Sequence, residues 1–203
     1  MSKPENLKTI KRGCQDIIYK EKGSKFIGFA RHVGNAQEAL DFFDSLKKEH
    51  YGANHCCYAY RLGIDAEEVR ANDDGEPTHS AGTPILGQIQ SFGLTNTAVA
   101  VVRYFGGTKL GVGGLIKAYK NTAQHTLESC EFEVEVAYVI ARLVFDYPNI
   151  GVAMQWLKQG ALKIQEQKLD QKCQISFSIP QNRIEESRLY WQSFPEISIQ
   201  FEP

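Results

Sequence analysis

Residues 103–120, RYFGGTKLGVGGLIKAYK, place five glycines within nine positions and surround them with basic side chains. Glycines allow backbone N–H groups to converge on an anion, and the N-terminus of a following helix adds partial positive charge. These residue types in this order predict a strand, a glycine-rich turn and a helix that bind an anion between them. The residues expected to bind it are Arg103, Gly106, Gly107, Lys109, Gly111, Gly113, Gly114 and Lys117.

The two common nucleotide-binding motifs are absent from this segment. Gly106 and Gly111 have the spacing of a P-loop, but they are followed by Val112 and Gly113 instead of Lys and Ser or Thr. A dinucleotide fingerprint starting at Gly111 would need a glycine at position 116, where the chain has Ile116. The segment therefore predicts a looser anion site that prefers a polymer to a free nucleotide.

Acidic residues are missing around this turn. Positions 77–127 contain no Asp or Glu, and they carry a net charge of +4 from Arg103, Lys109, Lys117 and Lys120. Six acids crowd the preceding positions, namely Asp65, Glu67, Glu68, Asp73, Asp74 and Glu76. The contrast predicts an electropositive concavity for phosphate, for RNA backbone or for an acidic protein segment. The alternative is that the glycines only make a tight connection and the lysines solvate an exposed helix face.

The acidic loop NDDGEP offers three carboxylates, Asp73, Asp74 and Glu76. Clustered carboxylates could hold Mg²⁺ or Ca²⁺, although the spacing is not that of an EF-hand. Asp-Gly followed by Pro is equally ordinary turn chemistry. A third alternative is that these carboxylates pair with Arg103 or Lys109 and order the loop. We expect hydrogen bonds to order it, and we predict no metal ion and no cofactor.

A cysteine and histidine cluster and four aromatic residues are further candidates for function. His55 lies beside Cys56 and Cys57, and a nearby imidazole can activate a thiol. The segment alternates like a strand, however, which sends neighbouring side chains to opposite faces. Packing is therefore favoured here and no catalytic residue is predicted, so the chain is not expected to be an enzyme. Four aromatics could stack on bases, although at least two of them should lie in the core: Tyr58, Tyr60, Tyr104 and Phe105.

The elements that must position the turn follow from hydrophobic periodicity. The first half predicts the order ββαβαβα, with an acidic loop from Asp65 to Pro77. Its strands are expected within 16–33, 55–63 and 96–105, and its helices over 35–50, 80–92 and 112–130. The apolar run 96–105 is too continuous for a strand with one wet face, so it should be buried on both faces.

The second half predicts the order βαββαβ, the split-βαβ or ferredoxin-like pattern. Its strands are expected within 133–147, 161–169, 172–180 and 196–202, and its helices over 148–160 and 182–191. We place the boundary between Cys130 and Val136, which gives domains of residues 1–133 and 134–203. The predicted fold class is α+β with two domains.

Composition bounds the class of the protein. The chain has 203 residues with 42% hydrophobic and 23% charged residues and a net charge of −1, so no global basic field indicates a nucleic-acid or membrane partner. Its five cysteines are scattered without a C-x-x-C pair, which predicts reduced thiols packed in the core. The start of the sequence lacks an apolar segment, and we expect a cytoplasmic protein that has no membrane partner.

Three stretches together resemble the IMPACT/YigZ family: ANHCCYAYRLG, DDGEPTHSAGTPIL and VVRYFGGTKLGVGGLIKAY. The resemblance covers Ser24 to about Ala123, and the second half is similar in pattern to the C-terminal domain of bacterial members. It implies a first domain that resembles the ribosomal-protein domain-2-like fold of domain IV of elongation factor G, and a second that resembles its domain V. One departure is His79, two positions after Glu76-Pro77, where the family usually has glycine, which leaves the backbone geometry of this loop open.

The resemblance implies a role linked to translation but transfers no catalytic residue. Eukaryotic relatives regulate translation under amino-acid starvation through protein contacts, and bacterial ones are suspected to bind nucleic acid or the ribosome. Our leading interpretation is therefore a translation-associated binding protein that contacts RNA or ribosomal phosphate backbone through the glycine-rich turn. One alternative is a regulator that contacts another protein, and another is an enzyme acting on a phosphorylated small molecule. An open face would favour a polymer or protein ligand, whereas a closed pocket would favour a metabolite.

Overall fold

The computed structural model describes residues 6–63 and 68–202, and it divides into two compact units. One unit spans Leu7–Glu135, and the other contains Val136–Pro203. The domain boundary at residues 133 and 134 stays a prediction until the two parts are shown to fold independently. We describe each unit separately.

The first unit is built on a five-stranded antiparallel sheet in the order β2-β3-β6-β4-β5. Its strands are β2 (Cys14–Glu21), β3 (Ser24–His32), β6 (Thr97–Tyr104), β4 (His55–Leu62) and β5 (Glu68–Asn72). The central strand β6 is buried along almost its whole length, as its apolar run predicts. Its register sets Arg103 opposite Phe26 on one side and opposite His55 on the other.

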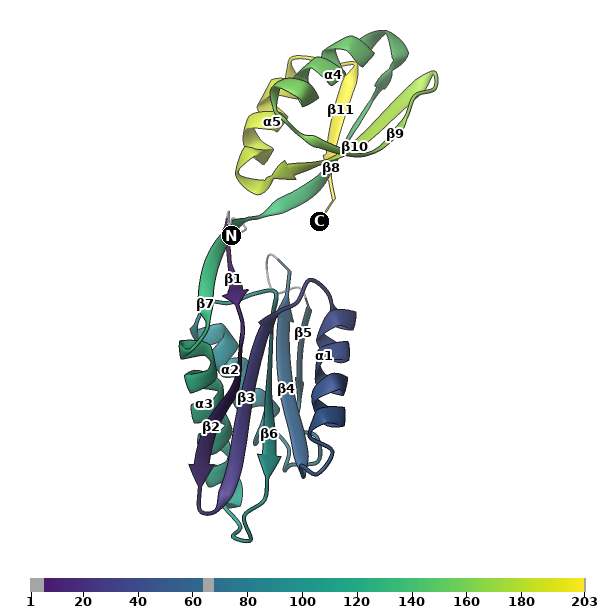
Figure 1. The fold of residues 1–203 in the computed structure, drawn as a ribbon. Coiled ribbons are helices and arrows are strands. Elements are labelled where there is room, and N and C mark those ends of the chain that lie inside the picture. The colour runs from purple at the N-terminus through teal and green to yellow at the C-terminus, as the bar shows by residue number, and fades with distance from the viewer. Residues whose placement is uncertain (1–5, 64–67, 203) are drawn as a thin grey trace. The chain divides into compact units, whose positions relative to one another are not determined.

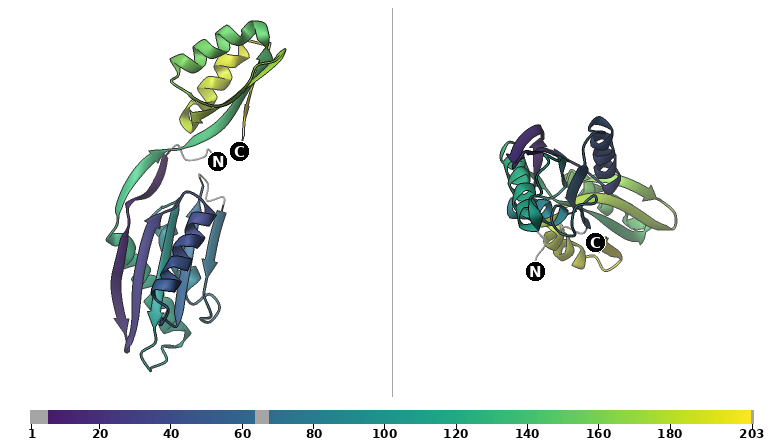
Figure 2. Two further views of the ribbon diagram at one scale, coloured as in Figure 1. Left: turned by 45° about the vertical axis from the view of Figure 1, so that its right-hand side comes forward. Right: turned by 90° about the horizontal axis from the view of Figure 1, so that it is seen from below.

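Helices cover both faces of this sheet (Figure 1). The helix α1 (Ala36–Glu49) packs on one face, where Figure 2 shows it in front of the strands, and its first turn is capped by the side chain of Asn35. The helices α2 (Gly82–Ser91) and α3 (Gly111–Glu128) pack on the other face. Adjacent residues of β4 alternate between the two cores, so that Cys56 packs under α1 and Cys57 under α3.

Three strands differ from the sequence-based expectation for the first unit. Residues Glu68–Asn72, placed in an acidic loop by the sequence, form the edge strand β5 against β4. Positions 65–67 of the predicted loop, including Asp65 and Glu67, lie outside the described residues. The N-terminal β1 (Asn6–Arg12) was not predicted, and it forms a two-stranded sheet with β7 (Glu131–Val136). The predicted single strand over 133–147 is interrupted at Ala137, because β7 and β8 belong to different sheets.

The second unit has the predicted order βαββαβ, with a four-stranded antiparallel sheet in the order β11-β8-β10-β9. Its elements are β8 (Tyr138–Asp146), α4 (Ile150–Gln159), β9 (Lys163–Lys168), β10 (Lys172–Pro180), α5 (Ile184–Gln192) and β11 (Ile197–Phe201). Alternate residues of β8 and β10 are buried, and Trp156 packs edge-on against Phe177 between helix and sheet. Across both units, no helix of the described residues is long and apolar enough to cross a membrane.

Candidate functional site

The glycine turn, which we define as Gly106–Gly114, connects β6 to α3 at one end of the first sheet. Figure 1 shows the turn between β2 and β3 at the same end. The loop that follows β5 also reaches this end, because Glu76 in that loop bonds Arg103 near the end of β6. Three loops from distant parts of the sequence are therefore gathered around the predicted site.

The β2–β3 hairpin packs so closely against position 106 that only glycine fits there. A Cβ atom at Gly106 would lie 1.9 Å from the carbonyl carbon of Gly23, which no side chain could tolerate. The backbone N–H of Gly106 donates to Ser24 Oγ over 3.2 Å. Part of the glycine run thus serves the packing of two turns, and the backbone that approaches it most closely is that of the β2–β3 turn.

Three of the four remaining glycines of the turn face open space, whereas a Cβ atom at Gly114 would lie 3.1 Å from the Cβ of Leu110. Gly107 and Gly111 have positive φ values of 86° and 71°, a conformation that favours glycine. A Cβ atom at Gly107, Gly111 or Gly113 would meet no heavy atom within 4 Å, and all three residues are exposed. The helix α3 starts at Gly111 without a side-chain cap, so the N–H groups of its first turn face solvent. This arrangement leaves room for an external hydrogen-bond acceptor.

Four lysines lie on the elements that meet at this end of the first sheet. Lys109 lies in the glycine turn and Lys117 lies two turns into α3, and both are exposed. Two more lysines, Lys22 and Lys25, are not among the residues predicted from the sequence, and they lie on the β2–β3 hairpin whose Gly23 approaches Gly106. No local pattern could have found them, because only the pairing of β3 with β6 sets Lys25 opposite Tyr104. The nearest acid of this hairpin, Glu21, accepts a hydrogen bond from Tyr19 over 3.3 Å.

The structure corrects the expectation that Arg103 offers a mobile charge. Its side chain is 7% exposed, and its guanidinium forms an ion pair with Glu76, which is 4% exposed. The guanidinium also lies over the rings of Phe26 and Phe105, at 5.5 and 5.6 Å from their centroids. Arg103 is therefore held inside the first unit beneath the glycine turn, and its charge is neutralised there.

Glu76 joins the acidic loop to α3 as well as to β6. Its Oε1 accepts a hydrogen bond of 2.7 Å from the hydroxyl of Tyr119, which is completely buried. The thiol of Cys57 donates in turn to this hydroxyl over 3.3 Å. Burial, followed by the neighbouring Cys57 and Glu76, raises the pKa of Tyr119, so that it remains a neutral donor. The expectation that a carboxylate of this loop pairs with Arg103 is confirmed, and Lys109 is not its partner.

Asp73 and Asp74 are also bonded within the protein. Asp73 accepts from the backbone N–H groups of Ala81 at 2.9 Å, Gly82 at 2.8 Å and His79 at 2.8 Å, and it thereby caps α2. Burial acts to raise the pKa of Asp73, but these three N–H donors outweigh it and the pKa is lowered.

Asp74 bonds the first sheet and the end of α1 in the same way. It accepts from the backbone N–H of Cys56 and from the ammonium of Lys47, each over 2.7 Å. The bond to Asp74 raises the pKa of Lys47. Hydrogen bonds thus order the acidic loop as expected, and its carboxylate oxygens are directed at protein donors instead of converging on one point.

His79 has a backbone conformation that glycine adopts without strain. Its φ is 62°, in the left-handed region that non-glycine residues rarely adopt. The N–H bond from His79 to Asp73 and a 3.1 Å bond from its ring to Thr83 accompany this conformation. The chain therefore forms this turn with a histidine at a position whose backbone conformation favours glycine.

The histidine and cysteine cluster is part of the packing, as expected. Burial raises the pKa of Cys56 to about 12 and also raises that of Cys57, so neither thiol is a reactive thiolate at neutral pH. His55 is held by a 2.8 Å bond from its ring to the carbonyl of Asp74. Of the four aromatics considered for base stacking, Tyr58 and Tyr60 are buried, Tyr104 bonds His50 over 2.9 Å and Phe105 is exposed.

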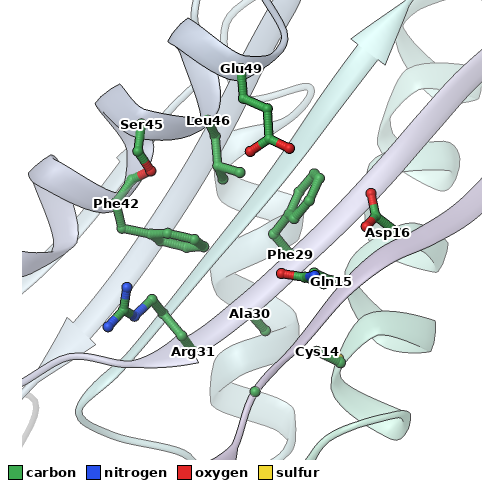
Figure 3. A pocket seen from close by; sticks show the side chains of 11 residues that line it. Cys14, Gln15, Asp16, Phe29, Ala30, Arg31, Phe42, Ser45, Leu46 and Glu49 are labelled. Carbon is green, nitrogen blue, oxygen red and sulfur yellow. The ribbon is translucent and has the colours of Figure 1, made fainter.

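A separate hollow of about 480 Å³ lies on the α1 face of the first sheet (Figure 3). The rings of Phe29 and Phe42 border it together with Leu46, and Arg31 and Glu49 add charged groups at its rim. None of the predicted anion-binding residues lines this hollow. It is a distinct concavity of mixed character on a different face from the glycine turn.

Comparison with known proteins matches the chain to one family over most of its length. The Impact N-terminal domain matches residues 22–127, which contain the glycine turn and the acidic loop. An IMPACT family member of Haemophilus influenzae is 32% identical over 173 residues, which are 83% of this chain and 84% of the relative. The IMPACT family member YvyE of Bacillus subtilis is 36% identical over 158 residues, 78% of this chain and 72% of the relative. A crystal structure of a hypothetical protein, 26% identical, has a TM-score of 0.78 and covers 98% of both chains.

Proposed function

This chain belongs to the IMPACT family, and from that premise we propose that it is a cytoplasmic translation-associated binding protein that contacts RNA or ribosomal phosphate backbone through the glycine turn. The observation that carries the proposal is the open backbone at Gly107, Gly111 and Gly113 beside an uncapped helix N-terminus. N–H groups in such a position bind phosphate oxygens, and the helix dipole favours negative charge there.

The charged residues near the turn support an anionic ligand. Lys22, Lys25, Lys109 and Lys117 supply positive charge, whereas Asp73, Asp74 and Glu76 are held by internal bonds. We therefore revise the contact set by replacing Arg103 with the two hairpin lysines. The role of each remaining residue is a proposal that binding measurements test.

The exposure of the turn favours a polymer over a metabolite. A site for a small phosphorylated substrate encloses most of its ligand, whereas these glycines lie on an exposed surface. Neither buried acid beneath the turn is placed as a general base, because Tyr119 is a buried neutral hydroxyl and Glu76 is paired with Arg103. We propose that the surface binds its ligand without transforming it.

Salt-dependent binding tests the proposal. Each phosphate contact to a single strand contributes a slope of about −0.7 in log affinity against log salt, so Lys109→Gln with Lys117→Gln should make the slope shallower by roughly 1.4. Binding of single-stranded RNA and of ribosomes is measured from low to moderate salt. Lys163→Gln with Lys172→Gln, two exposed positions of the second sheet, is the control with the same loss of charge.

Two results would redirect the proposal. If the Lys109 and Lys117 double variant keeps the wild-type affinity and slope, the glycine turn is not the contact surface. If the wild type binds neither RNA nor ribosomes, the alternatives are a regulator that contacts another protein and an enzyme acting on a phosphorylated small molecule. Turnover of such a molecule would identify the latter.

A further inference from the structure

Two of the five cysteines lie side by side at the other end of the elements that carry the candidate site. Cys14 is the first residue of the edge strand β2, and Cys130 follows the end of α3. Their Sγ atoms are 2.9 Å apart. Both residues are half-buried, whereas Cys56, Cys57 and Cys173 are buried.

The carbonyl oxygen of Thr126 fixes both thiols in this position. It accepts from the Cys14 thiol over 2.8 Å and from the Cys130 thiol over 3.3 Å. Thr126 is itself buried in the last turns of α3, with its hydroxyl bonded to the carbonyl of Thr122 over 2.6 Å. The two sulfurs therefore meet on a rigid helix end and not on a loose surface loop.

The two thiols differ in acidity in the way that a reacting pair requires. The contact between the two thiols lowers the pKa of Cys14, and the same contact together with burial raises the pKa of Cys130. Cys14 is thus the sulfur of the pair that ionises more readily. Formation of an S–S bond of about 2.05 Å would require the sulfurs to approach by less than about 1 Å.

We propose that Cys14 and Cys130 are a redox modification site that closes to an intramolecular disulfide when the protein meets a peroxide. The Cys14 thiolate attacks one oxygen of hydrogen peroxide, the O–O bond breaks, and the product is a sulfenic acid with release of hydroxide, which takes up a proton as water. The Cys130 sulfur then attacks the Cys14 sulfur, loses its proton and expels the hydroxyl group as a second water molecule. Two thiols are oxidised by two electrons, and one peroxide is reduced to two waters.

The bond would join the edge strand β2 to the end of α3. Strand β2 leads from Cys14 to the hairpin that carries Lys22 and Lys25, and α3 leads back from Cys130 to the glycine turn. The closed loop spans most of the first unit, so the chain-entropy model predicts a marked stabilisation against unfolding. The measured unfolding temperature of this unit should rise by at least about 4 °C on oxidation.

Thiol counting with peptide mapping tests the proposal on the full chain. The protein is treated with a small excess of hydrogen peroxide, unfolded with iodoacetamide present and digested for mass spectrometry. The expected result is that three of the five cysteines remain alkylated, that a peptide pair joined through Cys14 and Cys130 is found, and that dithiothreitol restores all five.

Variants separate this pair from the other thiols. Cys130→Ser should stop at a Cys14 sulfenic or sulfinic acid with no internal disulfide, whereas the control Cys173→Ser should form the disulfide as the wild type does. The proposal is overturned if wild-type protein keeps five alkylatable thiols, forms a different pair, accumulates sulfinic acid on Cys14 or becomes a disulfide-linked dimer. Peptide mapping of the wild-type protein tests the proposal even if a serine variant fails to fold.

Discussion

Replacing Glu76 by Gln should destabilise the first unit strongly, because among the described residues Glu76 is the charged partner of the buried guanidinium of Arg103. The two side chains are 4% and 7% exposed, so water cannot replace the lost carboxylate. Breaking a buried pair by removing one partner costs about 3–5 kcal/mol. Gln can still accept a bond from Tyr119, so we expect a loss of about 3 kcal/mol in the free energy of unfolding, near the lower limit.

The distribution of tryptophan provides an assay that resolves the two units. Both tryptophans, Trp156 and Trp191, lie in the second unit, so their fluorescence reports its unfolding, whereas far-UV circular dichroism reports both units. In urea, Glu76→Gln should move a circular-dichroism transition to lower concentration and leave the fluorescence transition in place. Glu128→Gln, an exposed position on α3, is the matched control and should change stability by less than about 0.5 kcal/mol.

A double-mutant cycle tests whether the unpaired charge of Arg103 causes the loss of stability. If the charge left unpaired on Arg103 causes the loss, Arg103→Met combined with Glu76→Gln should be more stable than Glu76→Gln alone. A Glu76→Gln protein as stable as wild type would mean that the buried pair does not hold the acidic loop to β6. An additive cycle would mean that the two residues act independently.

Three further predictions address the boundary, the acidic loop and its pH dependence. Limited proteolysis should cut first at residues 131–137, or a fragment ending near Cys130 should fold alone; cleavage only within the second half, with no soluble first domain, contradicts the boundary. Mg²⁺, Mn²⁺ and Ca²⁺ should leave thermal stability nearly unchanged, and a saturable rise of several degrees that Asp74→Asn abolishes would instead reveal a metal site. Because the pKa of Asp73 is lower in the folded protein than in the unfolded chain, its carboxylate stabilises the fold at pH values above the unfolded pKa. The free energy of unfolding should therefore decrease as the pH is lowered below about 4, and it should decrease less steeply in Asp73→Asn. The same pH dependence in the two proteins would contradict this role.

The elements that the sequence predicts correctly are those whose burial shows in local periodicity. The continuous apolar run of β6 and the helical stripe of α3 each carry their own signal, because a strand buried on both faces and a helix buried on one have different patterns. Strand β5 has no such signal, since all but one of its residues are exposed and it lies at the sheet edge. Its pairing with β4 decides its conformation, and that pairing is not local in sequence.

The residues of the candidate site also fall into two groups: those that local sequence indicates, and those that only tertiary contacts bring to the turn. The glycine turn is contiguous, so its residues could be proposed from spacing alone, and Gly107 and Gly111 have the positive φ values that favour glycine. Lys22 and Lys25 could not be identified, because they reach the turn only through the close approach of Gly23 to Gly106. Arg103 was counted as available charge because a formal charge shows in the sequence whereas its buried partner does not.

The pairing of Arg103 with Glu76 also determines how binding experiments on this surface must be interpreted. Positions 77–127 contain three lysines and no Asp or Glu, and the β2–β3 hairpin adds Lys22 and Lys25. Positive charge therefore remains near the turn even without Arg103. Loss of RNA binding on replacing Arg103 would therefore not identify it as a contact, because the same change breaks a buried ion pair and releases the acidic loop beneath the turn. Only a variant that weakens binding while its urea transition stays at the wild-type position identifies a contacting residue. Because Lys109 and Lys117 are exposed, we expect their replacement to leave the urea transition in place, so these two residues can be tested in this way.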